Sequence, residues 1–275
     1  MQFEIERIVR TALAEDIGLG DVTTEVTIAR DSVARADLVA KENFTLAGID
    51  VAEVVFRTLD RDVRFEKIFV DGQSVRKGEV IAWLKGKSSV LLQGERVALN
   101  LLQRMSGIAS LTAQYVAAVE GTTAKIVDTR KTVPGLRALD KYSVRMGGGW
   151  NHRIGLFDGV LIKENHIAAA GGISAAIERA KGKLSHTLKI EIETRNLAEA
   201  EEALLAGADI IMLDNMSLAE MSQGVELIAG RALVEASGGV NLERVRDIAE
   251  TGVDIISVGA LTHSVSAADI SMLFN

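Results

Sequence analysis

The sequence predicts an α/β protein, in which a small α+β portion is followed by a series of strand–helix units. Three observations predict this class. Short β-rich runs broken by turn residues occur up to residue 90, six apolar runs follow in the second half, and helix-period segments separate the last four of those runs. These four runs end near Glu193, Leu213, Ala236 and Val258, at intervals of 20, 23 and 22 residues. Such regular spacing predicts right-handed βαβ crossovers and a parallel sheet.

The six runs are "AKIV", "GVLI", "LKIEIE", "ADIIML", "ALVEA" and "VDIISV". They are apolar at successive positions, which is typical of strands that are covered on both faces. A closed barrel explains this pattern best, and a doubly wound sheet, which gives similar local patterns, stays open as an alternative. Two of the intervening helices are expected to begin with capping boxes, Asn196 to Glu199 and Ser217 to Glu220.

The first part of the chain has shorter elements. Residues 3–15 have a helical period, and the runs "RADLVA", "VRFEKIFV" and "VIAWLKG", separated by the turn signals "DGQS" and "RKGE", predict strands. Residues 94–120 predict a long helix with a break near Gly107. We therefore expect a small α+β domain before the strand–helix series.

Composition excludes several classes of function. The 275 residues include no cysteine, so disulfides, thiolate metal sites and a thiol nucleophile are impossible. A net charge of −7 argues against general nucleic-acid binding, which needs a basic surface. Neither a signal-peptide run nor an apolar stretch of ~18–20 residues is present, and we expect a cytoplasmic protein that does not cross a membrane.

One segment departs from this acidic balance. Residues 125–166 contain eight lysines and arginines against four acidic residues, together with the one proline and two of the four histidines. A local excess of positive charge in an acidic chain indicates a site for a small anion.

Chemically active residues lie where the predicted strands end, which is where barrels of this class carry their chemistry. Alone, each has an ordinary interpretation as a solvated loop, a helix cap or a tight turn. Their conjunction on one predicted face favours a functional site, made of Thr129, Arg130, Lys131, Lys163, Glu193, Asp214, Ser237–Gly239 and Gly259–His263.

Elementary chemistry suggests what this face binds. Glycine-rich turns that lead into helix N-termini favour a phosphate. The carboxylates of Glu193 and Asp214 suggest a divalent metal on a polyphosphate, with Mg²⁺ favoured by ligands that are all oxygen. Arg130, Arg153 and Lys163 are suited to clamp the carboxylates of a second, anionic substrate.

The segment "TRKTVPGLRALDKYSVRMGGGWNHRIGLFDGVLIKENHI" closely resembles the signature of the quinolinate phosphoribosyltransferases, also called carboxylating nicotinate-nucleotide pyrophosphorylases. The resemblance extends over nearly the whole chain and includes "ALAEDIGLGDVTTE", "GERVALNLLQRMSGIAS", "IEIETRNLAEAEEALLAGADIIMLDNMS", "VEASGGV" and "DIISVGALTHS". It implies an N-terminal α+β open sandwich over residues 1–106, to which the tail 265–275 returns, and a C-terminal incomplete α/β barrel over 107–264. It also implies a homodimer with active sites shared between subunits, and higher oligomers stay open.

The resemblance further implies that quinolinate and phosphoribosyl pyrophosphate react to give nicotinate mononucleotide, pyrophosphate and CO₂, with Mg²⁺ and without an organic cofactor. It places quinolinate against Thr129, Arg130, His152, Arg153 and Lys163, with Arg96 supplied by the partner subunit. Lys131 would lie between quinolinate and pyrophosphate, and Glu193 and Asp214 would hold the ribose hydroxyls and Mg²⁺, directly or through substrate and water. The catalytic residues would be Lys131, Lys163, Glu193 and Asp214. The 5′-phosphate would lie against Ser237, Gly238, Gly239, Gly259 and His263.

Alternatives come from the same fold and from other classes. A paralogue from molybdate-transport gene clusters would be expected to lose part of the carboxylate clamp, whereas "NHR" and "LIKENH" are intact here. A nicotinate-using, non-decarboxylating enzyme needs to bind one carboxylate rather than two. A phosphate-binding barrel lyase could use Lys163 as a Schiff-base lysine. The stretch "DGQSVRKGEVIAWLKG" resembles half of a lipoyl-type domain, and it has no lysine at the expected hairpin tip.

Overall fold

The structure is a computed structural model that describes residues 2–275. The chain forms two compact units. The first contains the residues up to Ala113, Thr132–Gly148 and Thr262–Asn275, and the second contains Gln114–Lys131 and Gly149–Leu261. The domain boundaries expected from the sequence stay a prediction.

An antiparallel four-stranded sheet forms the centre of the first unit. Its order is β12 (Ile270–Phe274), β1 (Val33–Ala40), β5 (Val80–Lys87) and β3 (Arg64–Lys67). The C-terminal strand β12 pairs with β1, with Leu38 opposite Met272. A two-stranded ribbon, β2 (Phe44–Thr45) with β4 (Ser74–Val75), accompanies this sheet. The C-terminal residues are therefore built into the sheet of the first part of the chain.

The helices of the first unit are α1 (Gln2–Ile17), α2 (Val22–Thr27), α3 (Ile49–Leu59), α5 (Arg137–Met146) and most of α4 (Ser88–Ala118). All of them except α2 contribute to a core shared with the sheet, in which Leu38, Phe56 and Leu102 are fully buried. The break that we expected in α4 near Gly107 was wrong, because the helix is continuous over 31 residues. A Cβ at Gly107 would lie 2.1 Å from the Ser266 carbonyl oxygen, so this glycine permits a close backbone approach.

Six parallel strands form the second unit. Their order is β6 (Lys125–Val127), β11 (Ile255–Ser257), β10 (Leu233–Ser237), β9 (Ile210–Asp214), β8 (Ile190–Thr194) and β7 (Val160–Ile162). Each corresponds to one of the six apolar runs, which confirms the predicted class. Among residues 2–275, the edge strands β6 and β7 share no ladder, so the closed barrel favoured by the pattern was wrong and the barrel is incomplete.

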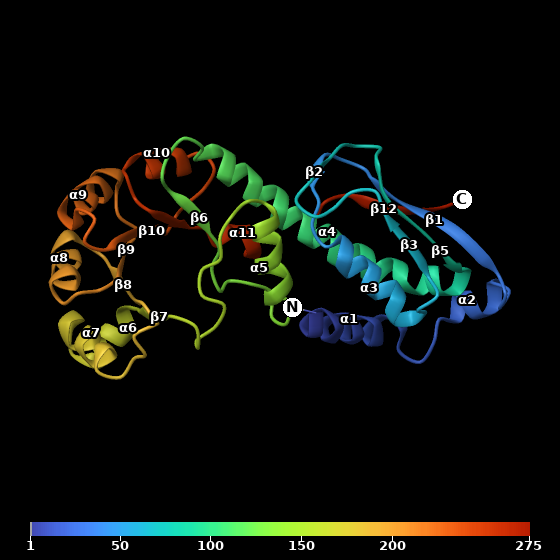
Figure 1. The fold of residues 1–275 in the computed structure, drawn as a ribbon, viewed down its shortest axis with the longest axis horizontal. Coiled ribbons are helices and arrows are strands. Elements are labelled where there is room, and N and C mark those ends of the chain that lie inside the picture. The colour runs from blue at the N-terminus through green and yellow to red at the C-terminus, as the bar shows by residue number, and fades with distance from the viewer. Residues whose placement is uncertain (1) are drawn as a thin grey trace. The chain divides into compact units, whose positions relative to one another are not determined.

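Helices line the outer side of this curved sheet (Figure 1). They are α6 (Glu164–Ala170), α7 (Ile173–Lys181), α8 (Leu197–Leu205), α9 (Leu218–Ile228) and α10 (Val245–Glu250), while the short α11 (Ala260–His263) follows β11. The capping box of α9 is complete, since Ser217 and Glu220 bond reciprocally. In α8, Asn196 caps the Glu199 N–H as predicted, but the Glu199 carboxylate accepts from the Arg195 N–H instead.

A connecting segment lies beside the open edge of the sheet. The Trp150 N–H donates to the Ile126 carbonyl (2.8 Å), and the Asp128 N–H donates to the Trp150 carbonyl (3.2 Å). Residues 149–159 therefore begin alongside β6 and lead to β7 at the other edge. Within the described chain, no helix has the length and apolarity needed to cross a membrane.

Candidate functional site

Two carboxylates lie at the ends of neighbouring strands. Glu193 is the fourth residue of β8, and Asp214 is the last residue of β9. β8 and β9 pair in parallel with Thr194 opposite Leu213. The 21-residue period of the sequence therefore brings both carboxylates to the same end of the sheet, as expected for parallel strands with equivalent ends.

Each of these carboxylates has a close partner. The Lys163 ammonium donates to Glu193 Oε2 at 2.5 Å, and the Asn215 amide donates to Asp214 Oδ2 at 2.8 Å. Lys163 directly follows β7 and is 49% exposed, so its amino group remains accessible. A cavity of about 190 Å³ beside Glu193 is lined by residues of α6 and α8 and by Arg195.

The turns after β10 and β11 are shaped by glycine. Gly238 and Gly239 follow Ser237 with φ values of +91° and +61°. A Cβ at Gly238 would lie 2.2 Å from Asn215 Oδ1, so a larger residue would displace the turn beside Asp214. Ser237 also accepts the Asn215 N–H through its carbonyl at 2.9 Å. Gly259 occupies the equivalent position after β11, directly before α11.

A group of cations lies on the open side of the sheet. In the turn after β6, the Lys131 N–H donates to Thr129 Oγ1 at 3.0 Å, and Lys131 itself is exposed. Burial, and then the nearby charge of Arg130, lower the pKa of Arg153. Arg153 also donates to the Gly159 carbonyl at 3.2 Å. Two guanidinium groups that repel each other in a partly buried place form a site that a polyanion would stabilise.

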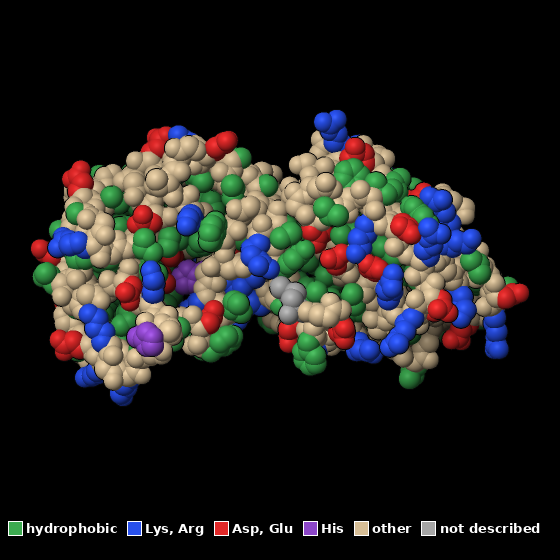
Figure 2. Space-filling view, viewed as in Figure 1, with side chains coloured by type: hydrophobic (Ala, Val, Ile, Leu, Met, Phe, Trp, Pro, Cys, Tyr) green, Lys and Arg blue, Asp and Glu red, His purple; other side chains and the backbone are tan. Residues whose placement is uncertain are grey.

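This positive charge is local. Figure 2 shows acidic and basic side chains interspersed over the visible face, without a broad surface of one sign. The face in this view therefore carries no extended basic surface.

Asp128 is a residue of this region to which we assigned no role from the sequence. It directly follows β6, is fully buried, and accepts the His152 N–H at 2.9 Å and the Asn151 amide at 2.6 Å. A carboxylate that accepts these bonds holds the segment 149–159 against the first strand. Its place directly after an apolar run is the signal that could have identified it.

A second group that we did not identify lies inside the sheet. His152 Nε2 is 3.0 Å from Glu191 Oε2 and 3.7 Å from Glu235 Oε2. Glu191 is 4% exposed and Glu235 is 1% exposed. Burial, followed by the charge of Glu191, raises the pKa of Glu235 to about 8. Across residues 2–275, these three are the one set of acidic and histidine side chains spaced closely enough to share a metal ion.

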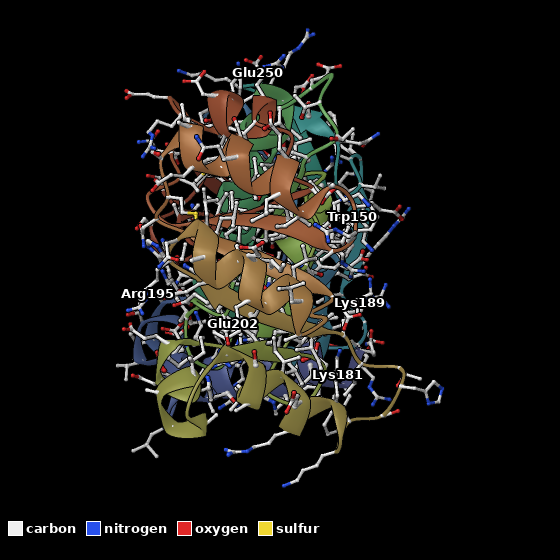
Figure 3. All side chains as sticks on the ribbon, turned by 90° about the vertical axis from the view of Figure 1, so that its left-hand side faces the viewer. Trp150, Lys181, Lys189, Arg195, Glu202 and Glu250 are labelled. Carbon is white, nitrogen blue, oxygen red and sulfur yellow. The ribbon has the colours of Figure 1, made fainter. Side chains whose placement is uncertain are left out.

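These three residues line a cavity of about 570 Å³. Arg153 lines it as well, and four further lining residues stand at or just before the first residue of a strand, namely Val160, Lys189, Ile210 and Ile255. Figure 3 shows the two ends of this unit, with Arg195, which follows β8, on one side and Lys189, which precedes β8, on the other together with Trp150. The larger cavity therefore opens toward the amino ends of the strands, away from Glu193 and Asp214.

Three residues predicted for the site, Arg96, Thr262 and His263, belong to the first unit. Arg96 is exposed on α4, and His263 is exposed at the end of α11, where its Nδ1 bonds the Ser264 hydroxyl at 2.6 Å. All other residues of the predicted site lie in the second unit. The structure thus gathers the strand-end residues and the segment 149–159 in one unit.

Comparisons with known proteins match both parts of the chain. The model "Quinolinate phosphoribosyl transferase, N-terminal domain" matches residues 21–106, and the corresponding C-terminal domain model matches residues 108–273. A "probable nicotinate-nucleotide pyrophosphorylase [carboxylating]" of Bacillus subtilis is 44% identical over 269 residues, which cover 98% of this chain and 93% of that protein. A "quinolinate phosphoribosyltransferase [decarboxylating] 1b" of Nicotiana tabacum is 44% identical over 98% of this chain and 82% of its own length.

Solved structures match equally well. The nicotinate-nucleotide pyrophosphorylase of Francisella tularensis is 42% identical and superimposes with a TM-score of 0.96, over 100% of this chain and 97% of that one. Sequence and fold therefore both match these proteins over the two units of the chain, including the strands that carry the strand-end residues.

Proposed function

This chain belongs to the quinolinate phosphoribosyltransferase family, and from that premise we propose that it forms nicotinate mononucleotide, pyrophosphate and CO₂ from quinolinate and phosphoribosyl pyrophosphate, a step of NAD biosynthesis. The observation that carries this proposal is the pair of neighbouring guanidinium groups, Arg130 and Arg153, in the same unit as the strand-end carboxylates. The two guanidinium groups suit a dicarboxylate substrate, and the strand-end carboxylates suit a ribose that becomes positively charged.

Quinolinate carries two adjacent carboxylates, and the cations of the second unit suit both. Arg130 and Arg153 would bind them through bidentate forks, and Lys163 and Thr129 would add donors. The lowered pKa of Arg153 indicates a partly desolvated guanidinium, which gains most from a bound anion. His152 was predicted as a further quinolinate contact, and that role remains a proposal.

Ribosyl transfer develops positive charge on the sugar as pyrophosphate leaves. Glu193 and Asp214 are placed to stabilise that charge and to accept hydrogen bonds from the ribose hydroxyls. The pyridine nitrogen then bonds to the anomeric carbon and becomes cationic. Lys131, exposed after β6, would lie between the two substrates and stabilise the departing pyrophosphate.

Magnesium fits the donors at the strand ends. Glu193 and Asp214 supply carboxylate oxygens, the ligand type that Mg²⁺ prefers, and both are only half-buried. They provide two protein carboxylates, which suits an ion that arrives on a polyphosphate and keeps several waters. When bound, Mg²⁺ would neutralise charge on the pyrophosphate leaving group.

The 5′-phosphate has a matching cradle in the glycine turns. Gly238 and Gly239 follow β10 with positive φ, and Gly259 lies between β11 and α11, so the backbone at both strand ends can approach a phosphate closely. Ser237 would add a hydroxyl, and His263 was predicted as a further contact. The Asn215 side chain leaves no room for a Cβ at Gly238, so a larger residue there would displace the turn beside Asp214.

Decarboxylation follows from the chemistry of the ring. Loss of CO₂ from carbon 2 leaves an electron pair beside the cationic ring nitrogen, which stabilises it, so the reaction requires no organic cofactor. A proton must then reach carbon 2. Lys163 carries a proton within the same unit and is accessible, which makes it the candidate to stabilise or protonate this carbon.

A homodimer with shared sites completes the proposal. Arg96 is exposed on α4 and would enter the quinolinate site of the partner subunit as another carboxylate fork. If so, Arg96→Ala and Lys131→Ala homodimers are each nearly inactive, and refolding them together restores up to about a quarter of wild-type activity, because about half the dimers are mixed and each has one intact site. Exchange is verified with two affinity tags. Exchanged mixtures that remain inactive would refute the role in trans.

The function itself is tested by a product assay. Purified protein, Mg²⁺ and phosphoribosyl pyrophosphate are incubated with quinolinate or with nicotinate, and mononucleotide and CO₂ are measured. We expect equal amounts of both products from quinolinate and a far lower kcat/KM for nicotinate. Comparable turnover of nicotinate would contradict the carboxylating assignment. Cytoplasmic localisation stays a prediction.

A further inference from the structure

Both ring nitrogens of His152 are engaged by the protein itself. The backbone N–H of Arg153 donates to His152 Nδ1 at 2.8 Å. On the other side of the ring, Nε2 is 3.0 Å from Glu191 Oε2. Because an acceptor nitrogen carries no proton, Nδ1 is unprotonated and the proton of the neutral ring is on Nε2. His152 therefore donates to Glu191 and connects the interior of β8 with the backbone of Arg153.

The segment that carries Arg153 is also held by Asp158, which accepts the Ile154 and Gly155 N–H groups at 2.7 and 2.8 Å. It joins the two edge strands of the incomplete barrel, and it begins at Trp150 with two backbone hydrogen bonds to β6 and the residue after it. Asp128 holds the backbone of His152 from β6 at 2.9 Å, and Glu191 holds the ring from β8. At its far end, the Arg153 guanidinium donates to the Gly159 carbonyl. The His152 ring is thus the contact that ties the Arg153 backbone to Glu191 in the interior of the sheet.

Glu235 is the second buried glutamate near the His152 ring. It is the third residue of β10, is 1% exposed, and lies 3.7 Å from His152 Nε2 through its Oε2. The Oε1 atoms of Glu191 and Glu235 are both buried and accept no hydrogen bond. Two buried carboxyl groups are costly, and middle layers of such sheets are ordinarily filled by Val, Ile and Leu. A purely structural core does not need this pair.

We propose that Glu191 and Glu235 are positioning residues of the quinolinate subsite, which fix the Nε2-protonated tautomer of His152 and thereby the backbone and guanidinium of Arg153. The expected effect on quinolinate binding rests on the proposed function, whereas the hydrogen-bond chain from Glu191 through His152 to Arg153 does not. In this arrangement, His152 acts through Arg153 and has no ring nitrogen left to donate to quinolinate. This differs from the role that the resemblance implied for His152.

A metal ion shared by the three side chains is the competing interpretation of the same cluster. The 3.0 Å separation between His152 Nε2 and Glu191 Oε2 is that of a direct hydrogen bond. The donor from Arg153 also fixes the ring without any metal. We therefore favour the hydrogen-bonded chain and make the metal an outcome of the test.

The kinetic test uses two substitutions at one position. Glu191→Ala removes the acceptor, and we expect the KM for quinolinate to rise about 10- to 100-fold with kcat and the KM for phosphoribosyl pyrophosphate nearly unchanged, because a displaced guanidinium binds one substrate poorly. Glu191→Gln keeps an acceptor oxygen and should return the KM to within about threefold. Glu226→Ala, an exposed glutamate of α9, is the matched control. An unchanged quinolinate KM in folded Glu191→Ala protein would overturn the proposal.

A second measurement does not depend on activity. In wild-type protein with ¹⁵N-labelled histidine, the His152 ring, assigned by its loss in His152→Asn, should show a proton on Nε2 and none on Nδ1 across neutral pH. Glu191→Ala should abolish that single tautomer. A proton on Nδ1 would overturn the proposal, and so would a stoichiometric divalent metal in purified protein that Glu191→Ala loses. If the protein does not turn over quinolinate while the tautomer is as expected, the proposed function fails and the hydrogen-bond chain stands.

Discussion

Strand β8 presents two glutamates to the same side of the sheet in different surroundings. Glu191 is buried against a histidine, whereas Glu193, two residues further on, is half-buried at the strand end and bonded to an accessible lysine. Side chains alternate along a strand, so residues two apart point the same way and are separated by roughly 7 Å. β10 repeats the arrangement with Glu235 inside and Ser237 at the end.

This difference shows how position along a strand sets the role of one residue type. At the end of the strand, a carboxylate can meet a developing positive charge on a substrate. One layer deeper, burial disfavours the charge, and the same group holds neighbouring side chains through hydrogen bonds. The outer layer is therefore expected to control the rate of reaction and the inner layer the binding of quinolinate.

The largest effect is expected at the outer layer. Asp214→Ala should lower kcat about 100- to 1,000-fold with little change in the quinolinate KM, because it removes an interaction that strengthens in the transition state. Steady-state kinetics with circular dichroism as the folding control tests this. A rise in quinolinate KM with kcat preserved would place Asp214 in substrate binding and remove the distinction between the layers.

Arg153 is the residue through which we propose that the inner layer affects substrate binding. Arg153→Ala should raise the quinolinate KM about 30- to 1,000-fold, the range for losing a buried charge-assisted pair of about 2–4 kcal/mol. Arg179→Ala, at an arginine in the last turn of α7, serves as the control for lost charge. Wild-type kinetics in folded Arg153→Ala protein would contradict the clamp.

The titration of Glu235 in the inner layer should make the free energy of unfolding depend on pH. Between the ordinary pKa of 4.5 and the raised value of about 8, folded Glu235 holds a proton that the unfolded chain has released. The free energy of unfolding should therefore fall as pH rises through this window, by about 1.4 kcal/mol per pH unit for this group. Glu191, His152 and Ser257 all face this carboxyl and modulate the transition.

Glu235→Gln removes this titration and should flatten that part of the curve. Urea unfolding of wild type and variant at pH 6, 7 and 8 measures the difference, with the exposed Glu226→Gln as control. Parallel curves for wild type and Glu235→Gln would show that burial does not hold a proton on Glu235.

The smallest effect concerns a residue near a strand end that has no role in the reaction. Ser217→Ala removes the N-cap of α9 and should lower the free energy of unfolding by about 1 kcal/mol while kcat and both KM values stay unchanged. Ser222→Ala, within the same helix, should have no such cost. A kinetic effect of Ser217→Ala would show that proximity to the strand ends alone influences the reaction.

Much of the outer layer could be predicted from sequence, because the period of the strand–helix units places Glu193 and Asp214 at equivalent positions. Lys163 was found in the same way, since it directly follows an apolar run. The roles of these residues stay predictions. The inner layer was missed, because a glutamate within "IEIE" or "LVEAS" has no local signal that tells which side chain it meets.

That partner comes from a distant segment. His152 reaches Glu191 because residues 149–159 lie along an open sheet edge, and the openness of the barrel is a property of the whole fold. The pattern of apolar residues favoured a closed barrel, in which this segment would have had no such place. A charged residue inside a strand that is otherwise apolar on both faces is the signal that could have indicated the inner layer.

The most direct measurement compares Glu191→Gln with Glu193→Gln, which are the same substitution on one strand two residues apart. Steady-state kinetics are recorded for both at saturating phosphoribosyl pyrophosphate and Mg²⁺. Glu193→Gln should lose about 100-fold or more in kcat, whereas Glu191→Gln should keep kcat within about threefold, because only Glu193 is proposed to face the reacting ribose. Equal losses of kcat in the two variants would contradict the division of this sheet into a reacting outer layer and a positioning inner layer.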